Sequence, residues 1–235
     1  MKAVIIAAGI SSRLTEATKG MSKALLPLGS GTILSKILTH FSLCGINEFC
    51  IVVGHQSEKL IRYVEDQQNF GFRITFIENP EWKRGNGISV LAAEPAVKGQ
   101  DFILSMSDHI VPPAAMARLI DADIQRNALL VDTQVNRIFD IDDATKVRVE
   151  GDSIFEIGKE LKRYNGIDCG IFRLNDRFFD SMREALKQSR ESISAAIEGL
   201  IQRGDMAAMF MEKGGEWIDI DTPEAYRHAL KRYPE

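Results

Sequence analysis

Cysteines and long apolar stretches are scarce in this chain of 235 residues. The three cysteines, Cys44, Cys50 and Cys169, are odd in number and include no Cys-x-x-Cys pair, which argues against a disulfide framework and a zinc ribbon. We expect buried or half-buried free thiols. No stretch approaches the roughly twenty apolar residues of a membrane span. The first apolar run is short and Arg13 soon follows it, so we expect a cytoplasmic protein without a signal peptide.

A basic excess is also absent, because 29 Lys and Arg residues face 33 Asp and Glu residues, for a formal net charge of −4. Nucleic-acid binders usually carry the opposite balance, so we expect no nucleic-acid partner. The motifs G-x-x-x-x-G-K-[ST], G-x-G-x-x-G and G-x-S-x-G are missing, and the histidines lack zinc-ligand spacing. Any anionic ligand must therefore meet a local cluster of cations.

The first half of the chain alternates strand-like and helix-like patterns. Apolar runs predict strands at Lys2–Ala7, Glu48–Val53, 72–78 and 101–108, and helical spacing predicts helices at 31–43, 57–66, 85–97 and 113–123. This alternation predicts an α/β fold with a doubly wound, mostly parallel, Rossmann-like sheet and helices on both of its faces.

The second half is richer in strands and forms a small β-rich addition to the predicted sheet. Because no linker, repeat or low-complexity segment separates the halves, we expect a single domain over 1–235, with halves of about 1–120 and 121–235. A Gly-Asp turn at Gly151 predicts a hairpin. Thr222 and Pro223 predict the start of the last helix. Strands are expected at 127–135, 144–159, 166–175, 206–212 and 216–221, and helices at about 175–189, 192–203 and 222–233.

Small residues and a cation follow the first predicted strand. Ala7, Ala8 and Gly9 allow backbone N–H groups to approach phosphate oxygens, and Arg13 offers a bidentate clamp. A plain turn at the end of the strand accounts for the same composition. Ligands of open α/β sheets bind at the carboxyl ends of the strands, so this loop lies where a ligand is expected.

Three carboxylates are candidates for a cation site. Asp108 ends a buried strand, where it binds a hard cation or caps the next helix. Asp219 and Asp221 are two residues apart on a predicted strand and so share one face, where a cation would relieve their repulsion. Capping or solvation is the alternative for Asp221. His109, beside Asp108, fits a local hydrogen-bond partner better than a ligand contact.

Lys23 and Lys159 lie in unusual surroundings for lysines. Most lysines are solvated surface residues, but these two stand in the apolar or glycine-bearing segments SKALLPLG and FEIGKEL. Trp82 and Trp217 fit packing positions better than stacking platforms.

The segments AVIIAAGISSRL and SKALLPLG resemble the opening of the nucleotidyltransferases that make sugar nucleotides from an NTP and a phosphorylated substrate. SMSDHIV resembles their metal-binding aspartate strand, and EWIDIDTPEAY resembles their closing segment. These matches follow the expected order over almost the whole chain. Ser11 stands where many relatives have glycine, and Ser22 stands where proline usually precedes the lysine, which loosens the fixed φ before Lys23.

Within this superfamily, whose fold is GT-A-like, the middle of the chain most resembles CTP:inositol-1-phosphate cytidylyltransferases. The segments that carry the likeness are RGNGISVLAA, DATKVRVEGDSIFEIGKEL and GIDCGIF. Such enzymes are often fused to a membrane synthase domain. The sequence shows none, so we expect any second enzyme to be a separate protein. A homodimer is compatible with the resemblance.

The resemblance implies a Mg²⁺-dependent transfer of a cytidylyl group from CTP to a small phosphorylated alcohol, inositol 1-phosphate first. The half about 1–120 would bind the nucleotide and the half about 121–235 the acceptor. Catalysis would rest on charge neutralisation and in-line positioning. The implied catalytic residues are Arg13, Lys23, Asp108 and Lys159; the nucleotide contacts Ala7, Ala8, Gly9, Arg13, Lys23, Gly85 and Asn86; the acceptor contacts Lys159 and Asp168; and the Mg²⁺ ligands Asp108, Asp219 and Asp221.

Three other functions stay open. A phosphocholine or phosphonate cytidylyltransferase shares several of these segments. A hexose-1-phosphate nucleotidyltransferase would use another NTP, although RGNGIS differs from its usual base loop. A non-catalytic nucleotide sensor is the least favoured, because Arg13, Lys23, Asp108 and Asp219 are all present.

Overall fold

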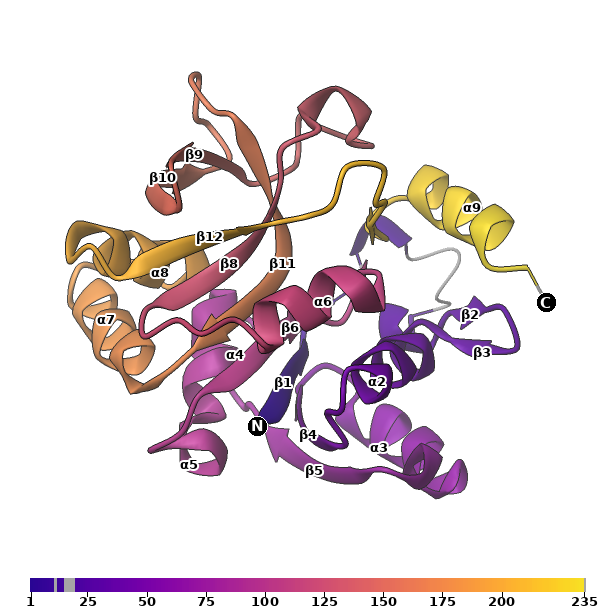
Figure 1. Ribbon diagram of the computed structural model, residues 1–235. Helices are drawn as coiled ribbons and strands as arrows, with labels where there is room; N and C mark the ends of the chain where they lie inside the picture. The colour runs from indigo at the N-terminus through magenta and orange to yellow at the C-terminus, as the bar shows by residue number, and fades with distance from the viewer. Residues whose placement is uncertain (11, 15–19, 235) are drawn as a thin grey trace.

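The computed structural model describes residues 1–10, 12–14 and 20–234 and centres on one mixed sheet (Figure 1). Ser11, where the sequence departs from the resembling pattern, lies outside the described residues. Within the described residues, this sheet has nine strands: β1 (Lys2–Ala7), β4 (Glu48–Val53), β5 (Arg73–Glu78), β6 (Phe102–Met106), β8 (Asn127–Asp132), β9 (Lys146–Glu150), β10 (Ser153–Gly158), β11 (Gly166–Leu174) and β12 (Met206–Phe210).

The strand order is β5-β4-β1-β6-β11-β8-β12-β10-β9. The four strands of the first half are parallel, and the chain steps outward from β1 to β4 and β5 before β6 returns to the other side of β1. The order thus reverses between β1 and β6, which is where open α/β sheets bind ligands. The doubly wound prediction is confirmed.

The strands of the second half extend the same sheet. β11 joins β6 in antiparallel orientation, β8 and β12 are parallel to each other, and β9 and β10 form the hairpin predicted at Gly151. Figure 1 shows β9 and β10 at the upper end of the sheet, far from α5. The sheet is therefore parallel in its first half and mixed in its second.

Helices cover both faces of the sheet, as the alternation of apolar residues predicts. Along β1, Ala3 and Ile5 belong to one hydrophobic cluster, and Val4 and Ile6 belong to the other. This alternation explains why a strand buried on both faces has a continuous apolar sequence. One face packs against α2 (Ile33–Leu43), α3 (Ser57–Asp66), α6 (Pro113–Ile120) and α9 (Pro223–Arg232), and the other against α4 (Asn86–Ala92), α5 (Glu94–Val97), α7 (Asp176–Lys187) and α8 (Ile193–Gln202).

Several predicted elements are shorter in the structure, and the helix expected at 85–97 is divided into α4 and α5; two of the differences have a clear local cause. The helix expected from residue 31 begins at Ile33, because 31–32 form β3 (Gly31–Thr32), which pairs with β2 (Pro27–Leu28). The Thr32 side chain instead caps the helix, as part of a capping box. The strand expected at 216–221 contains only β13 (Ile218–Asp219).

The short length of β13 follows from its partner. β7 (His109–Ile110) ends just before two prolines that open α6, and proline has no N–H for a ladder. One further bond, from the Ile220 N–H to the Asp108 carbonyl at 2.9 Å, extends the contact. This small ladder brings residues 218–220 next to the segment that follows β6.

The cysteine and helix-cap predictions are confirmed. The three cysteines are free, Cys50 and Cys169 are buried, and Cys44 is half-buried. The Thr222 side chain accepts a hydrogen bond from the Ala225 N–H at the start of α9. Among the described residues, no helix combines the length and the apolar character that crossing a bilayer requires.

Candidate active site

Two adjoining cavities open at the carboxyl ends of β1 and β6. The larger has a volume of about 200 Å³ and the smaller about 170 Å³. Three residues line both: Asn86, Met106 and Asp108. Asp108 therefore lies where a ligand of one cavity would meet a ligand of the other.

The smaller cavity, called here the β1 cavity, contains part of the predicted nucleotide loop. Ala7, Gly9 and Lys23 line it together with Trp82. Ala8 is not among the described residues that line either cavity. It is buried, and its carbonyl accepts the His55 N–H at 2.9 Å.

Gly85 and Asn86, predicted to contact the nucleotide, stand at the start of α4. The Gly85 N–H donates to Glu191 Oε2 at 3.2 Å, and a Cβ on Gly85 would lie 2.6 Å from the Glu191 carbonyl carbon. Glycine is thus required here by close packing, and Gly85 is not among the described cavity-lining residues. Asn86 Oδ1 accepts the Ile193 N–H at 2.9 Å. Its NH₂ group is therefore the part left to face a ligand.

Lys23 begins a short 3₁₀ turn, Lys23–Leu25, and is deeply placed. Ser22 accepts the Ala24 N–H at 3.4 Å, so a side-chain cap fixes the start of this turn. The ammonium is ion-paired with Asp108 and Asp221. Burial alone would lower the pKa of Lys23, but these two carboxylates raise it above its ordinary value.

Asp108 is buried at the end of β6, with a partner on each oxygen. Lys23 pairs with Oδ2, and His109 Nδ1 lies 2.6 Å from Oδ1. Burial alone would raise the pKa of Asp108, but the charges of Lys23 and His109 hold it well below its usual range. The prediction that His109 is a local hydrogen-bond partner is confirmed.

The His109 ring is held on two sides. It stacks on Trp217 with the ring centroids 5.5 Å apart and the planes at 15°, and Gly170 lies against it. Trp217 donates its indole N–H to the buried Asp132 at 3.2 Å, so it packs as predicted and also anchors the stack. Burial lowers the pKa of His109, but Asp219 and Asp108 raise it to about 9.

Asp219 provides the strongest structural sign of a cation site. The β13–β7 ladder sets it opposite His109, and the candidate ligand atoms of Asp108, His109 and Asp219 lie within 4.8 Å of one another. Asp219 Oδ1 is buried and has no hydrogen-bond partner among the described residues. Burial, aided by Asp108 and Asp221, raises the pKa of Asp219 to about 7.

A divalent cation fits this group. Within the part of the chain that the structure describes, Asp219 Oδ1 has only a 3.8 Å ion pair with His109 Nδ1 and lies close to a second carboxylate, and carboxylate oxygens are the ligands that Mg²⁺ prefers. His109 Nδ1 is engaged by Asp108, so His109 is better suited to orient that carboxylate than to bind a cation through Nδ1. Asp221 also lines the larger cavity, but its two oxygens pair with Lys23 and Arg13.

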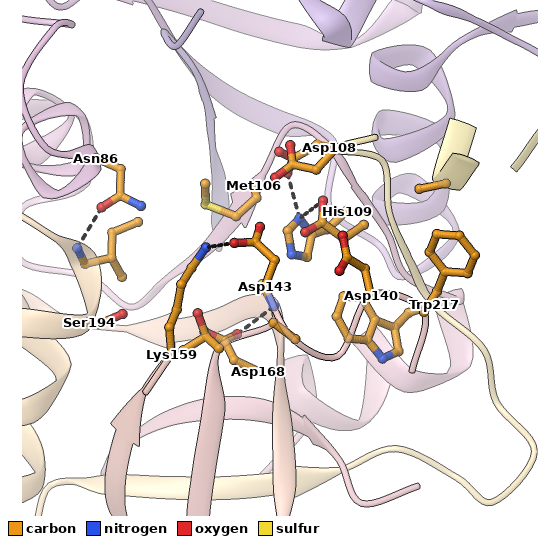
Figure 2. Close-up of a pocket in the computed structure, with 18 of the residues that line it drawn as sticks. Asn86, Met106, Asp108, His109, Asp140, Asp143, Lys159, Asp168, Ser194 and Trp217 are labelled. Carbon is orange, nitrogen blue, oxygen red and sulfur yellow. Dashed lines mark hydrogen bonds and ion pairs between the residues drawn. The ribbon is translucent and has the colours of Figure 1, made fainter. Parts of the chain in front are cut away.

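The larger cavity, called here the β11 cavity, contains both predicted acceptor residues, Lys159 and Asp168. Figure 2 shows Lys159 and Asp143 pointing toward each other across this cavity, with Asn86 on one side and Asp108 with His109 on the other. Asp168 Oδ1 accepts the Gly170 N–H at 2.7 Å. Burial raises the pKa of Asp168 to about 6.

Asp143 is a site residue that sequence reasoning missed. It lies in the acidic loop after β8 and binds two predicted phosphate ligands: Lys159 at 2.7 Å and Arg13 at 2.6 Å. An acidic run between strands usually indicates a solvated loop, so the charge pattern does not separate Asp143 from Asp140 or Asp142. The one available signal was that the resembling segment DATKVRVEGDSIFEIGKEL begins with Asp143. The structure thus links Arg13 to the β11 cavity through Asp143 and Asp221.

Comparisons with known proteins agree with this architecture. The bifunctional IPC transferase and DIPP synthase of Rubrobacter xylanophilus is 33% identical over 226 residues, which are 96% of this chain and 50% of that protein. The CMP-5'-(3-aminopropyl)phosphonate synthase of Streptomyces rubellomurinus is 31% identical over 252 residues, covering 99% of this chain and 39% of that protein. This chain thus spans half or less of the length of these curated relatives.

Solved structures show the same fold. The inositol-1-phosphate CTP transferase from T. maritima superposes with a TM-score of 0.86 at 23% identity, covering 100% of this chain and 96% of that one. A UDP-glucose pyrophosphorylase complexed with UDP-glucose has a TM-score of 0.84 at 17% identity, covering 99% and 97%. The sequence pattern of the nucleotidyl transferase family matches residues 2–235. This chain is therefore a member of the nucleotidyl transferase family.

Proposed function

We propose that the protein transfers a cytidylyl group from CTP to a small phosphorylated alcohol, inositol 1-phosphate first, and releases pyrophosphate. The observation that carries the proposal is the pair of cavities that meet at Asp108, each with a lysine at its wall. The names of the relatives support the choice of substrates, because the R. xylanophilus protein is an IPC transferase and the T. maritima structure an inositol-1-phosphate CTP transferase.

The reaction needs positioning more than proton transfer. An oxygen of the acceptor's phosphate attacks the α-phosphorus of CTP, one P–O bond forms, and the bond to the β-phosphate breaks. A phosphate monoester is already anionic at pH 7, with a second pKa of about 6, so no general base is required. The site must hold two polyanions in line and neutralise their charge.

On the nucleotide side, Lys23 and Arg13 would bind the triphosphate, and backbone groups near Gly9 would approach it. The Asn86 NH₂ would donate to an acceptor atom on the base edge, because its oxygen is held by Ile193. Trp82, on the wall of the β1 cavity, adds an apolar surface beside the base.

Asp108 and Asp219 would hold Mg²⁺, with Asp221 as a further candidate ligand. When bound, the ion would neutralise charge on the α-phosphate. His109 fixes the orientation of the Asp108 carboxylate through its 2.6 Å contact. The Trp217 ring stacks on His109 and holds it in place, so Trp217 and His109 together orient the Asp108 carboxylate.

On the acceptor side, Lys159 would bind the phosphate and Asp168 would accept hydrogen bonds from hydroxyl groups. Both line the β11 cavity, and the Gly170 N–H fixes Asp168 Oδ1 in its wall. The cavity volume of about 200 Å³ suits a single small ring or a short chain, rather than a polymer.

A matrix assay tests this function. Each NTP is combined with inositol 1-phosphate, phosphocholine, a hexose 1-phosphate and an aminoalkyl phosphonate, and pyrophosphate release is measured with and without Mg²⁺. We expect the fastest release with CTP and inositol 1-phosphate. Faster release with another NTP and a hexose phosphate would refute the assignment, and no release with any pair would refute the transferase function.

A phosphonate acceptor is the second candidate. It is supported by the 31% identity to the S. rubellomurinus phosphonate synthase over 99% of this chain. The aminoalkyl phosphonate in the matrix distinguishes the two, because Asp168 would then face an ammonium group in place of hydroxyls.

A further inference from the structure

An uninterrupted series of ion pairs connects the two cavities. Lys159 binds Asp143 Oδ1 at 2.7 Å, and Arg13 binds Asp143 Oδ2 at 2.6 Å. Arg13 and Lys23 both pair with Asp221, and Lys23 continues to Asp108. Positive and negative groups alternate along the series, so its six charges cancel: Lys159, Asp143, Arg13, Asp221, Lys23 and Asp108.

Asp143 has a special position in this series. Each of its two oxygens binds a cation, one from the β1 loop and one from the end of the β9–β10 hairpin. These are the same two cations that the proposed function assigns to the substrates' phosphates. Burial alone would raise the pKa of Asp143, but Lys159 and Arg13 hold it below its ordinary value, so the carboxylate is ionised at neutral pH.

A phosphate group and this carboxylate need the same donors. Both accept charge-assisted hydrogen bonds from guanidinium and ammonium groups, and each bond that Asp143 keeps is one that a phosphate oxygen lacks. The Asp143 side chain is 36% exposed and lies on a surface loop, so it is able to swing away without opening the core.

We propose that Asp143 is an internal competitor of substrate phosphate for Arg13 and Lys159, and so determines how tightly the site binds phosphate anions. This inference rests on the proposed function for the identity of the substrates. A nucleoside triphosphate has enough charge to displace the carboxylate from Arg13. A small anion such as pyrophosphate gains less, because Asp143 reclaims the cations.

The same competition favours product release. When pyrophosphate leaves, Asp143 re-forms its bond to Arg13, and when the CDP-alcohol leaves, it re-forms its bond to Lys159. Without Asp143, each of these cations would face its departing phosphate group with no alternative partner on that loop. Asp143 therefore lowers the affinity of the site for phosphate anions and speeds the release of products.

Calorimetric titration with pyrophosphate, in buffer containing a chelator, tests the inference without any turnover. Asp143→Asn removes the competing charge, and Asp143→Glu keeps it. Asp142→Asn is the matched control, because it makes the same charge change one residue away and its carboxylate forms no ion pair within the described part of the chain. Asp143→Ala serves as the second charge-removing variant.

We expect Asp143→Asn and Asp143→Ala to bind pyrophosphate about three- to tenfold more tightly than wild type, the effect of two partly exposed ion pairs. Asp143→Glu and Asp142→Asn should stay within about twofold of wild type. Unchanged or weaker binding by the charge-removing variants overturns the inference. An equal gain in Asp142→Asn also overturns it, because the effect would then be one of net charge.

Kinetics separate competition from a structural role. Asp143→Asn should lower the acceptor KM and strengthen product inhibition by pyrophosphate. A residue that only held its loop in place would raise KM and lower the unfolding midpoint when mutated. If no NTP and acceptor pair turns over while Asp143→Asn still tightens pyrophosphate binding, the proposed function fails and the competition stands. If the wild type turns over but Asp143→Asn binds pyrophosphate no more tightly than wild type, the proposed function stands and the competition fails.

Discussion

Gly170 packs against the ring of His109 beside the candidate metal site, and replacing it with alanine should lower both the stability of the protein and its kcat. Its φ is +73°, in the left-handed region that side chains rarely adopt. A Cβ there would lie 2.7 Å from Cγ and 2.8 Å from Nε2 of the His109 ring. The ring has little room to retreat, because Trp217 stacks on it and Asp108 holds its Nδ1.

The expected loss of stability has two parts. A left-handed conformation costs an alanine about 1–2 kcal/mol. Forcing a methyl group into a packed ring adds about 1–3 kcal/mol. Gly170→Ala should therefore lower the free energy of unfolding by about 2–5 kcal/mol, measured by urea denaturation with unchanged slope.

Gly151→Ala isolates the steric part. Gly151, in the turn of the β9–β10 hairpin, has a φ of +60°, but nothing lies within 4 Å of its missing Cβ. It should show only the conformational loss of about 1–2 kcal/mol and keep full turnover. Gly170→Ala should also lower kcat, because the displaced ring releases Asp108, while the KM for CTP changes little. Equal stability losses in the two variants, with turnover intact in both, would refute the role given to His109 and Gly170.

Three further outcomes follow from the site. Asp219→Asn should reduce kcat by about a hundredfold or more and abolish activation by Mg²⁺. The unfolding midpoint should hold or rise, because a buried carboxylate oxygen without a hydrogen bond in the described part of the chain is removed. Mg²⁺-dependent turnover near the wild-type rate would contradict this prediction. Lys159→Ala should raise the acceptor KM more than tenfold with little change in the KM for CTP, and the exposed Lys162→Ala is its control; weakened CTP binding would place Lys159 on the nucleotide side. For Asp168, the folded protein binds a proton more tightly than the unfolded chain, so stability should fall as pH rises from about 4 to 6, by at most about 3 kcal/mol. Asp168→Asn should flatten this pH profile of the melting temperature and raise the acceptor KM; a profile with the same slope would contradict it.

Elements buried on both faces could be predicted from sequence with accurate bounds. The prediction for β1 and β4 coincides with the structure, because a continuous apolar run of about six residues that ends in a glycine or a small residue is typical of a buried parallel strand. The insertion of β11 next to β6, and the parallel pairing of β8 with β12, could not be predicted. Pairing of strands that are distant in the sequence depends on the summed packing of many side chains, and no local pattern records it.

The candidate site shows the same contrast between residues that a local pattern identifies and contacts that only the fold creates. Asp108, Asp219, Lys23 and Lys159 stood out because each ends a strand or lies in an unusual segment, and the structure brings them to the walls of two joined cavities. Asn86 was expected to contact the nucleotide, but its oxygen accepts a hydrogen bond from the first residue of α8, 107 positions away in the sequence.

The β13–β7 ladder has a consequence for synthesis. The strands that carry the β1 loop and Asp108 leave the ribosome first, whereas Asp219 follows about 110 residues later. At bacterial or eukaryotic rates of translation this interval is roughly 5–20 s. If the proposed function holds, a nascent chain would complete the segments that bind the triphosphate well before it has the second carboxylate of the proposed Mg²⁺ site. The β13–β7 pairing would then be the step that makes the chain competent.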